Sequence, residues 1–134
     1  MAFQIKRPET AFSNSQRGKG SKKRPRVHAA EHRKWIAQQP CLITGRRDVQ
    51  AAHVKYADPR FGKPDVGGAE KPDDKWCVPL CIAEHVDQHK YDERGWWISK
   101  GIDPVAVASA LWASSGDDEA AEIIIREART KLKS

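Results

Sequence analysis

The histidines that could carry out chemistry lie in the middle of the chain, at His53, His85 and His89. His85 and His89 are four residues apart, so in a helix both imidazoles leave the same face and can share one metal ion. His53 closes an apolar segment, and a histidine with its unperturbed pKa of about 6.5 is largely neutral yet still basic near neutral pH. The pattern therefore predicts a divalent metal ion held by His85 and His89, with His53 as the candidate general base.

Two imidazoles are an incomplete set of ligands, so an oxygen ligand is also expected. Asp73 and Asp74 stand just before a predicted strand, and Asp74 is our choice as the third ligand. Imidazoles suit zinc, nickel or manganese, whereas carboxylate and water ligands would admit magnesium. The expected cofactor is one divalent ion, Mg²⁺, Mn²⁺ or Zn²⁺. The alternative is that these histidines are ordinary surface residues, because His-x-x-x-His alone arises by chance in many helices.

The cysteines do not complete a structural zinc site. Cys41 is followed at the third position by Thr44, and Cys81 by Glu84, so two of the four thiolates of a closed tetrahedral site are missing. Threonine is a poor zinc ligand. Cys77 lies at a position of the predicted strand whose side chain is expected to be buried rather than to act as a ligand. We expect no structural zinc, with Cys41 and Cys81 packed as small apolar groups.

These residues must be positioned by a small α+β body. Residues 28–39, which Pro40 ends, are predicted to form a helix with Trp35 and Ile36 facing inward. His32 on this helix is predicted to be at the surface or to contact phosphate, as is His28. Asp103-Pro104 is an N-cap followed by proline at the first helical position. Trp76, Trp96 and Trp97 are expected to pack the body together with Trp35. The predicted elements are helices over 28–39, 82–97, 105–113 and 117–131, strands over 49–54 and 76–80, a short strand or knuckle over 41–45, and a long loop over 57–75.

Positive charge is concentrated at the N-terminus. The net charge is +6, and residues 1–34 hold ten Lys or Arg against two acidic residues. Residues 1–26, rich in Gly, Ser and Pro, cannot bury enough apolar surface to offset their ordering entropy, so a disordered basic arm is predicted before a body over 27–134. Such an arm suits a polyanion, and nucleic acid is favoured over a merely solubilising tail. The residues predicted to contact nucleic acid are Lys22, Lys23, Arg24 and Arg26 in the arm, and Lys55, Arg60 and Lys63 in the body.

Composition restricts the setting of the protein. No apolar run approaches the about 18 residues that a membrane span needs. The start lacks the apolar region of a secretory signal, and three cysteines cannot all pair within one chain. We therefore expect a cytoplasmic protein without a membrane partner.

Several short segments, in this order, resemble a known family. They are 39–45 (Gln-Pro-Cys-Leu-Ile-Thr-Gly), 51–54 (Ala-Ala-His-Val), 71–74 (Lys-Pro-Asp-Asp), 78–81 (Val-Pro-Leu-Cys), Glu84-His85 and Gln88-His89. Across residues 24–112 the chain is similar to phage and prophage HNH nucleases of the recombination-enhancement, RecA-dependent type. The resemblance implies a small ββα-metal, treble-clef-like finger with flanking helices.

The same resemblance implies a divalent-metal DNA endonuclease in phage recombination or DNA processing. His53 matches the family's base, and His85 and His89 match its metal ligands. DNA is the implied substrate, and a RecA filament or another phage recombination protein is an implied partner. The implied location is the cytosol of a bacterial host.

The chain departs from the family at two positions. Ala52 stands where many members have a metal ligand, and Asp74 lies nearest to the place of the asparagine that orients the base. A second hypothesis is therefore a catalytically degenerate finger that binds DNA or a recombination complex without cutting. A third is an RNA-associated basic protein, because a basic arm does not distinguish RNA from DNA.

Overall fold

The computed structural model describes residues 29–64 and 73–133. The predicted arm over 1–26, with Lys22, Lys23, Arg24 and Arg26, lies outside the described residues, as does His28. None of the described helices is both long enough and apolar enough to cross a membrane.

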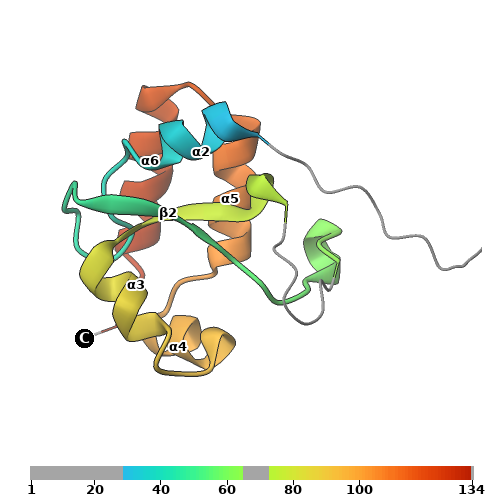
Figure 1. The fold of residues 1–134 in the computed structure, drawn as a ribbon, viewed down its shortest axis with the longest axis vertical. Coiled ribbons are helices and arrows are strands. Elements are labelled where there is room, and N and C mark those ends of the chain that lie inside the picture. The colour runs from blue at the N-terminus through green and yellow to red at the C-terminus, as the bar shows by residue number, and fades with distance from the viewer. Residues whose placement is uncertain (1–28, 65–72, 134) are drawn as a thin grey trace, which may run out of the picture.

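The centre of the molecule is a small antiparallel sheet of two strands in the described part of the chain. Strand β2 (Val49–His53) pairs with β3 (Cys77–Cys81), so that Val49 lies opposite Cys81 and His53 opposite Cys77. Figure 1 shows β2 crossing the middle of the molecule, in front of helices α5 and α6. Both predicted strands are confirmed to within one residue.

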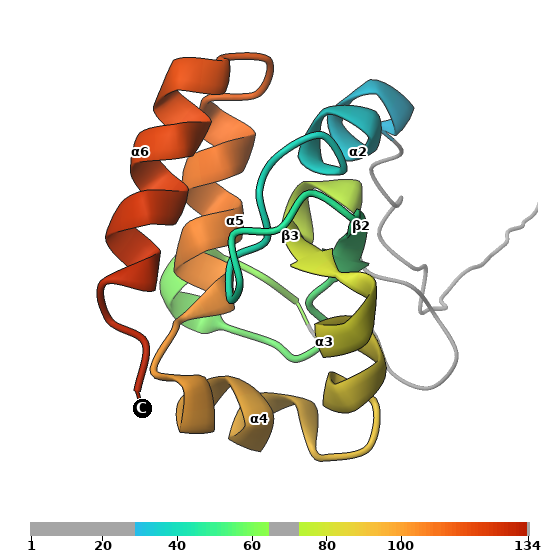
Figure 2. The ribbon, with the colours of Figure 1, turned by 90° about the vertical axis from the view of Figure 1, so that its left-hand side faces the viewer.

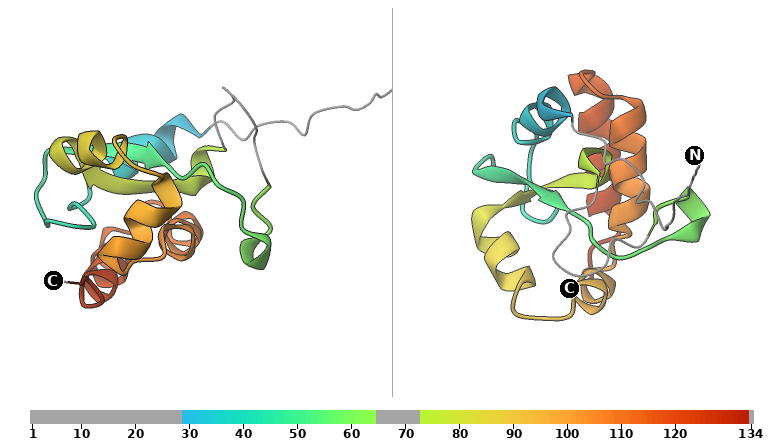
Figure 3. Two further views of the ribbon diagram at one scale, coloured as in Figure 1. Left: turned by 90° about the horizontal axis from the view of Figure 1, so that it is seen from below. Right: turned by 45° about the vertical axis from the view of Figure 1, so that its right-hand side comes forward.

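Five α-helices surround this sheet in the described residues, which confirms the α+β class. Helix α5 contacts β3 and packs side by side with α6, while α2 and α3 contact both strands. Figure 2 shows the α5–α6 pair on one side of the sheet, with α4 beneath, and Figure 3 shows the same arrangement from below. The helices are α2 (Ala30–Ile36), α3 (Ile82–Gln88), α4 (Glu93–Lys100), α5 (Pro104–Ala113) and α6 (Asp118–Arg129).

Aspartates begin three of these helices. Asp92, Asp103 and Asp117 each accept a hydrogen bond from a backbone N–H in the first turn, which satisfies a donor that has no partner within the helix. The predicted starts of α5 and α6 are confirmed. The prediction of one helix over 82–97 is wrong, because α3 ends at Gln88 and Asp92 caps a new helix, α4.

The four tryptophans that were predicted to pack the core do so. Trp35, Trp76, Trp96 and Trp97 are all buried, and the rings of Trp96 and Trp97 meet edge to face with centroids 4.9 Å apart. The prediction of a surface His32 is wrong, because this side chain is also buried.

Helix α2 is fixed by polar contacts to the α5–α6 connection. The Nε1–H of Trp35 donates to Asp118 Oδ1 over 2.7 Å, and His32 Nδ1 lies 2.7 Å from Ser115 Oγ. Both rings are buried, and these contacts give Trp35 Nε1 and His32 Nδ1 the hydrogen-bond partners that buried polar atoms need. The first described helix is thereby joined to the connection between the last two helices.

The last residues of the chain pack against the end of α4. Gly101 ends that helix in the left-handed conformation, with φ of 84°, and the backbone N–H of Lys133 donates to Lys100 O over 3.0 Å. A Cβ at position 101 would lie 2.5 Å from Lys131 O, so only glycine fits there without movement.

Candidate functional site

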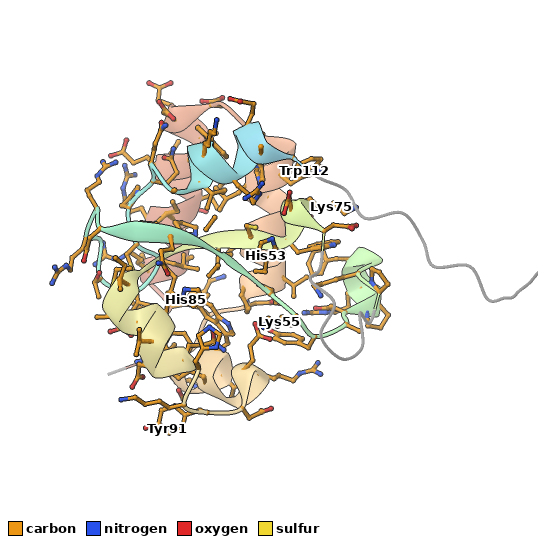
Figure 4. The ribbon with its side chains drawn as sticks, viewed as in Figure 1. His53, Lys55, Lys75, His85, Tyr91 and Trp112 are labelled. Carbon is orange, nitrogen blue, oxygen red and sulfur yellow. The ribbon has the colours of Figure 1, made fainter. Side chains whose placement is uncertain are left out.

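A pocket of about 330 Å³ lies between β2, α3 and the start of α4. Figure 4 shows His53, Lys55 and His85 close together between β2 and α3. The structure thus brings the predicted base and both predicted histidine ligands to one pocket. The described residues that line it are Ala51, His53, Lys55, His85, Gln88, His89, Tyr91 and Glu93.

His53 occupies the last position of β2 and forms a hydrogen bond with the buried carboxylate of Asp74. Its Nε2 lies 2.9 Å from Asp74 Oδ1, and 18% of the His53 side chain is exposed against 0% of Asp74. A carboxylate only accepts hydrogen bonds, so the neutral ring carries its proton on Nε2 and its lone pair on Nδ1. The contact therefore selects one tautomer and one ring orientation.

Asp74 is itself held in place through its second oxygen. Oδ2 accepts a hydrogen bond from the backbone N–H of Ala29 over 2.8 Å and forms an ion pair with Arg33 Nε at 3.1 Å. Asp74 belongs to a short 3₁₀ turn, Asp74–Trp76, directly before β3. A buried charge needs such partners, because it would otherwise give up its hydration without compensation.

His85 and His89 face the pocket from the helical side. Their ring centroids are 4.7 Å apart, which confirms that they share one face of α3 and its C-terminal end. His85 Nδ1 lies 2.7 Å from Gln50 Oε1, an arrangement in which Nδ1–H donates and Nε2 is available as a ligand. Burial, assisted by the charges of His89, Lys55 and His53, lowers the pKa of His85 and favours the neutral imidazole that a metal requires.

The structure does not bring Asp74 together with His85 and His89. Within the described ranges, the group of three potential ligands that approach within 4.8 Å of one another is His53, Asp74 and Cys77. The prediction of Asp74 as the third ligand of the histidine pair is therefore not supported, because its oxygens point to His53, Ala29 and Arg33.

Glu93 is the pocket carboxylate that sequence reasoning missed. Its two oxygens accept from the backbone N–H of Lys55 at 3.1 and 3.2 Å. Burial raises its pKa, while the Lys55 N–H opposes that shift. Glu93 was missed because one continuous helix was predicted over 82–97. The sequence signal was Asp92, a capping residue that starts a new helix and turns its first residue toward the pocket.

The three predicted phosphate contacts of the body differ in their surroundings. Lys55 is exposed and lines the pocket, so it remains a candidate. Lys63 is 2% exposed, which contradicts its prediction as a surface contact. The Arg60 guanidinium bonds Asp58 at 2.6 Å and Asp103 at 2.8 Å, so these carboxylates already neutralise it.

Cys41 and Cys81 are buried, as predicted, and are thiols rather than parts of a disulfide. The sulfur of Cys41 accepts from the backbone N–H groups of Ile43, Thr44 and Cys81 at 3.2–3.4 Å. Burial alone would raise the pKa of Cys41, but hydrogen bonds from the Thr44 side chain and from these N–H groups lower it overall. The turn that precedes β2 is thus organised around one sulfur atom.

Comparisons of the chain with protein-family models, with curated proteins and with solved structures found no match. The chemistry of the pocket rests on its own groups. They are an imidazole backed by a buried carboxylate, two further imidazoles on the facing helix, and an amine and a carboxylate from Lys55 and Glu93.

Proposed function

We propose that the protein is a divalent-metal-dependent DNA endonuclease of the HNH type, in which His53 is the general base. The observation that carries the proposal is the pocket itself. His53, oriented by Asp74, shares the pocket with the facing imidazoles of His85 and His89. The order strand, strand, helix that positions them, β2, β3 and α3, is the order of a ββα-metal finger.

His53 takes the proton of the attacking water at Nδ1. The Nε2–H of the ring continues to donate to Asp74, and the carboxylate stabilises the imidazolium that forms when Nδ1 accepts the proton. Asp74 does not touch the reacting atoms and acts as a positioning residue. The ion pair with Arg33 and the hydrogen bond from the N–H of Ala29 stabilise its negative charge in the buried site.

The residues that would hold a divalent ion are His85 and His89, and Glu93 lines the same pocket. In the described residues these three do not all approach within 4.8 Å of one another, so the carboxylate would have to move toward the imidazoles to supply an oxygen. Two imidazoles and a carboxylate suit Zn²⁺ or Mn²⁺, and water ligands would extend the choice to Mg²⁺. When bound, such an ion takes up negative charge on the phosphate and on the leaving oxygen. Gln50 holds His85 in the orientation for this task, and Lys55 supplies a positive charge for the phosphodiester backbone.

The test is a cleavage assay on supercoiled and single-stranded DNA, with EDTA, Mg²⁺, Mn²⁺ and Zn²⁺ in parallel and with a RecA filament as an added condition. His53→Ala should lower the cleavage rate about 10²- to 10⁴-fold, the usual contribution of a general base, while DNA binding is retained. His89→Ala should reduce metal-dependent cleavage. Lys90→Ala is the matched control, because Lys90 is an exposed neighbour outside the pocket lining and should cut as the wild type does.

A catalytically degenerate binding module is the second candidate, favoured by Ala52, a side chain that cannot ligate a metal at the position beside His53. In that case no condition would support cleavage, yet salt-sensitive DNA binding would persist. Equal cleavage by wild type and His53→Ala would reject the proposed base.

A further inference from the structure

We propose that His53, Asp74 and Cys77 form a second metal site, for Zn²⁺ or a similar ion, on the inner side of the pocket. The site is distinct from the proposed position at His85 and His89, and it does not depend on the protein being a nuclease. It is assembled by the sheet register and by the turn that leads into β3.

The geometry places three different ligand types together. His53 and Cys77 are opposite each other in the β2–β3 ladder, so their side chains leave the same face of the sheet. Asp74 stands three residues before Cys77, and its Oδ1 already lies 2.9 Å from His53 Nε2. One ligand atom from each of the three residues lies within 4.8 Å of the other two.

These separations are close to those of a zinc site. With Zn–N of about 2.0–2.1 Å and Zn–S of about 2.3 Å, tetrahedral ligand atoms lie roughly 3.3–3.7 Å apart. A contraction of about 1 Å is within reach of a ring rotation by His53, whose side chain is the partly exposed one of the three, at 18%. Asp74 and Cys77 are fully buried and provide the fixed part of the site.

The donor set and its surroundings favour zinc. Imidazole, carboxylate and thiolate are the three protein ligands of Zn²⁺, and three of them leave the fourth position open. Asp74 Oδ2 is held by the N–H of Ala29 and by Arg33, the kind of outer contact that orients a ligating carboxylate. A thiolate and a carboxylate together would neutralise the ion in this buried setting, whereas a hard ion such as Mg²⁺ would not accept the sulfur.

An ion can reach the site through the pocket, because His53 both lines the pocket and belongs to the group of three. Binding would replace the hydrogen bond between His53 and Asp74 with metal–ligand bonds. The ring proton would move from Nε2 to Nδ1 through water, and the Cys77 thiol would release its proton to solvent as the thiolate binds the ion. If the proposed nuclease function holds, Zn²⁺ at this position would remove the base and inhibit cleavage supported by Mg²⁺.

Cobalt is the probe, since Co²⁺ replaces Zn²⁺ in such sites and gives a sulfur-to-cobalt charge-transfer band only when a thiolate is bound. Titration of the full chain with CoCl₂ should produce this band with a stoichiometry of one. Cys77→Ser and Cys77→Ala should abolish it, whereas His89→Ala should keep it. Cys41→Ala and Cys81→Ala should also keep it, which separates the site from the other two thiols.

Absence of the band in the wild type, or its persistence in folded Cys77 variants, would overturn the proposal. So would its loss in Cys41→Ala alone. Because Cys77 is in the core, His53→Gln gives a second route that does not disturb buried packing, and it should weaken Co²⁺ binding at least about tenfold. Unchanged affinity in His53→Gln would likewise reject the site.

The inhibition arm distinguishes this proposal from the nuclease proposal. Added Zn²⁺ should inhibit Mg²⁺-supported cleavage by the wild type and leave Cys77→Ser insensitive. If no variant cleaves DNA at all, the nuclease proposal fails while the cobalt spectrum still decides the metal site.

Discussion

Replacement of Asp74 by asparagine should destabilise the protein by about 2 kcal/mol. The carboxylate accepts from Ala29 N–H and faces Arg33 and His53, and hydrogen bonds to charged groups contribute about 1.5–3 kcal/mol each. Asparagine retains one oxygen, which can serve Ala29, while its amide forces His53 into the opposite tautomer. Arg33 is 44% exposed and can return to water, so its loss adds little. Asp74→Ala removes both acceptors and should cost about 4 kcal/mol.

The assay is urea unfolding followed by tryptophan fluorescence, supported by thermal unfolding. For a domain of this size, about 2 kcal/mol corresponds to roughly 10 °C in Tm. Arg33→Gln is the control, since it removes only the partly exposed ion pair and should cost less than about 1 kcal/mol. The reasoning is refuted if Asp74→Asn unfolds at the wild-type urea concentration, or if Arg33→Gln is equally destabilising. Either result would mean that the buried carboxylate is not what fixes the turn before β3.

Three further predictions concern the rest of the fold. Burial lowers the pKa of His32, and the negative charge of Asp74 opposes this shift to a smaller extent. The unfolded chain therefore binds a proton at His32 more tightly than the folded chain does. The free energy of unfolding should consequently fall as the pH drops below about 6.5. Tm measured from pH 8 to 5 should fall less steeply in His32→Gln, and parallel curves would contradict this. Gly101→Ala should cost about 2–3 kcal/mol, because its Cβ meets a backbone oxygen at 2.5 Å, whereas Gly116→Ala, with a similar φ and open space, should cost about 1 kcal/mol. Ile125→Ala should cost about 3 kcal/mol and the exposed Ile123→Ala less than about 0.5 kcal/mol, as measured by urea unfolding.

The elements that the sequence predicted well are those with a strong local signal. Asp103-Pro104 and Asp117 mark helix starts by capping chemistry that needs no tertiary contact. The break between α3 and α4 was missed, because the chain around Asp92 contains neither proline nor a run of glycines. An aspartate inside a segment that favours helix can lie within one helix or cap a second one. The tertiary packing of the following residues decides between the two, and at Asp92 it starts a new helix.

The site was predictable in its histidines but not in its carboxylates. The spacing of His85 and His89 fixes their shared face once a helix forms. Asp74 was assigned to these histidines from its place before a strand, but which neighbour a buried carboxylate meets depends on the β2–β3 register and on α2, a helix distant in sequence. Burial of Lys63 likewise depends on tertiary contacts, because a charged side chain in a loop is predicted from sequence to be exposed.

The antiparallel ladder makes the protein unequally tolerant of changes in length. Side chains alternate along a strand, so the loss or gain of one residue within β2 would turn His53 to the opposite face of the sheet, away from Cys77. A longer connection between the two strands leaves that alternation intact, and doubling its length adds only about 0.6 kcal/mol of closure entropy. Natural variants of this chain should therefore differ in length between the strands, and hardly ever within them.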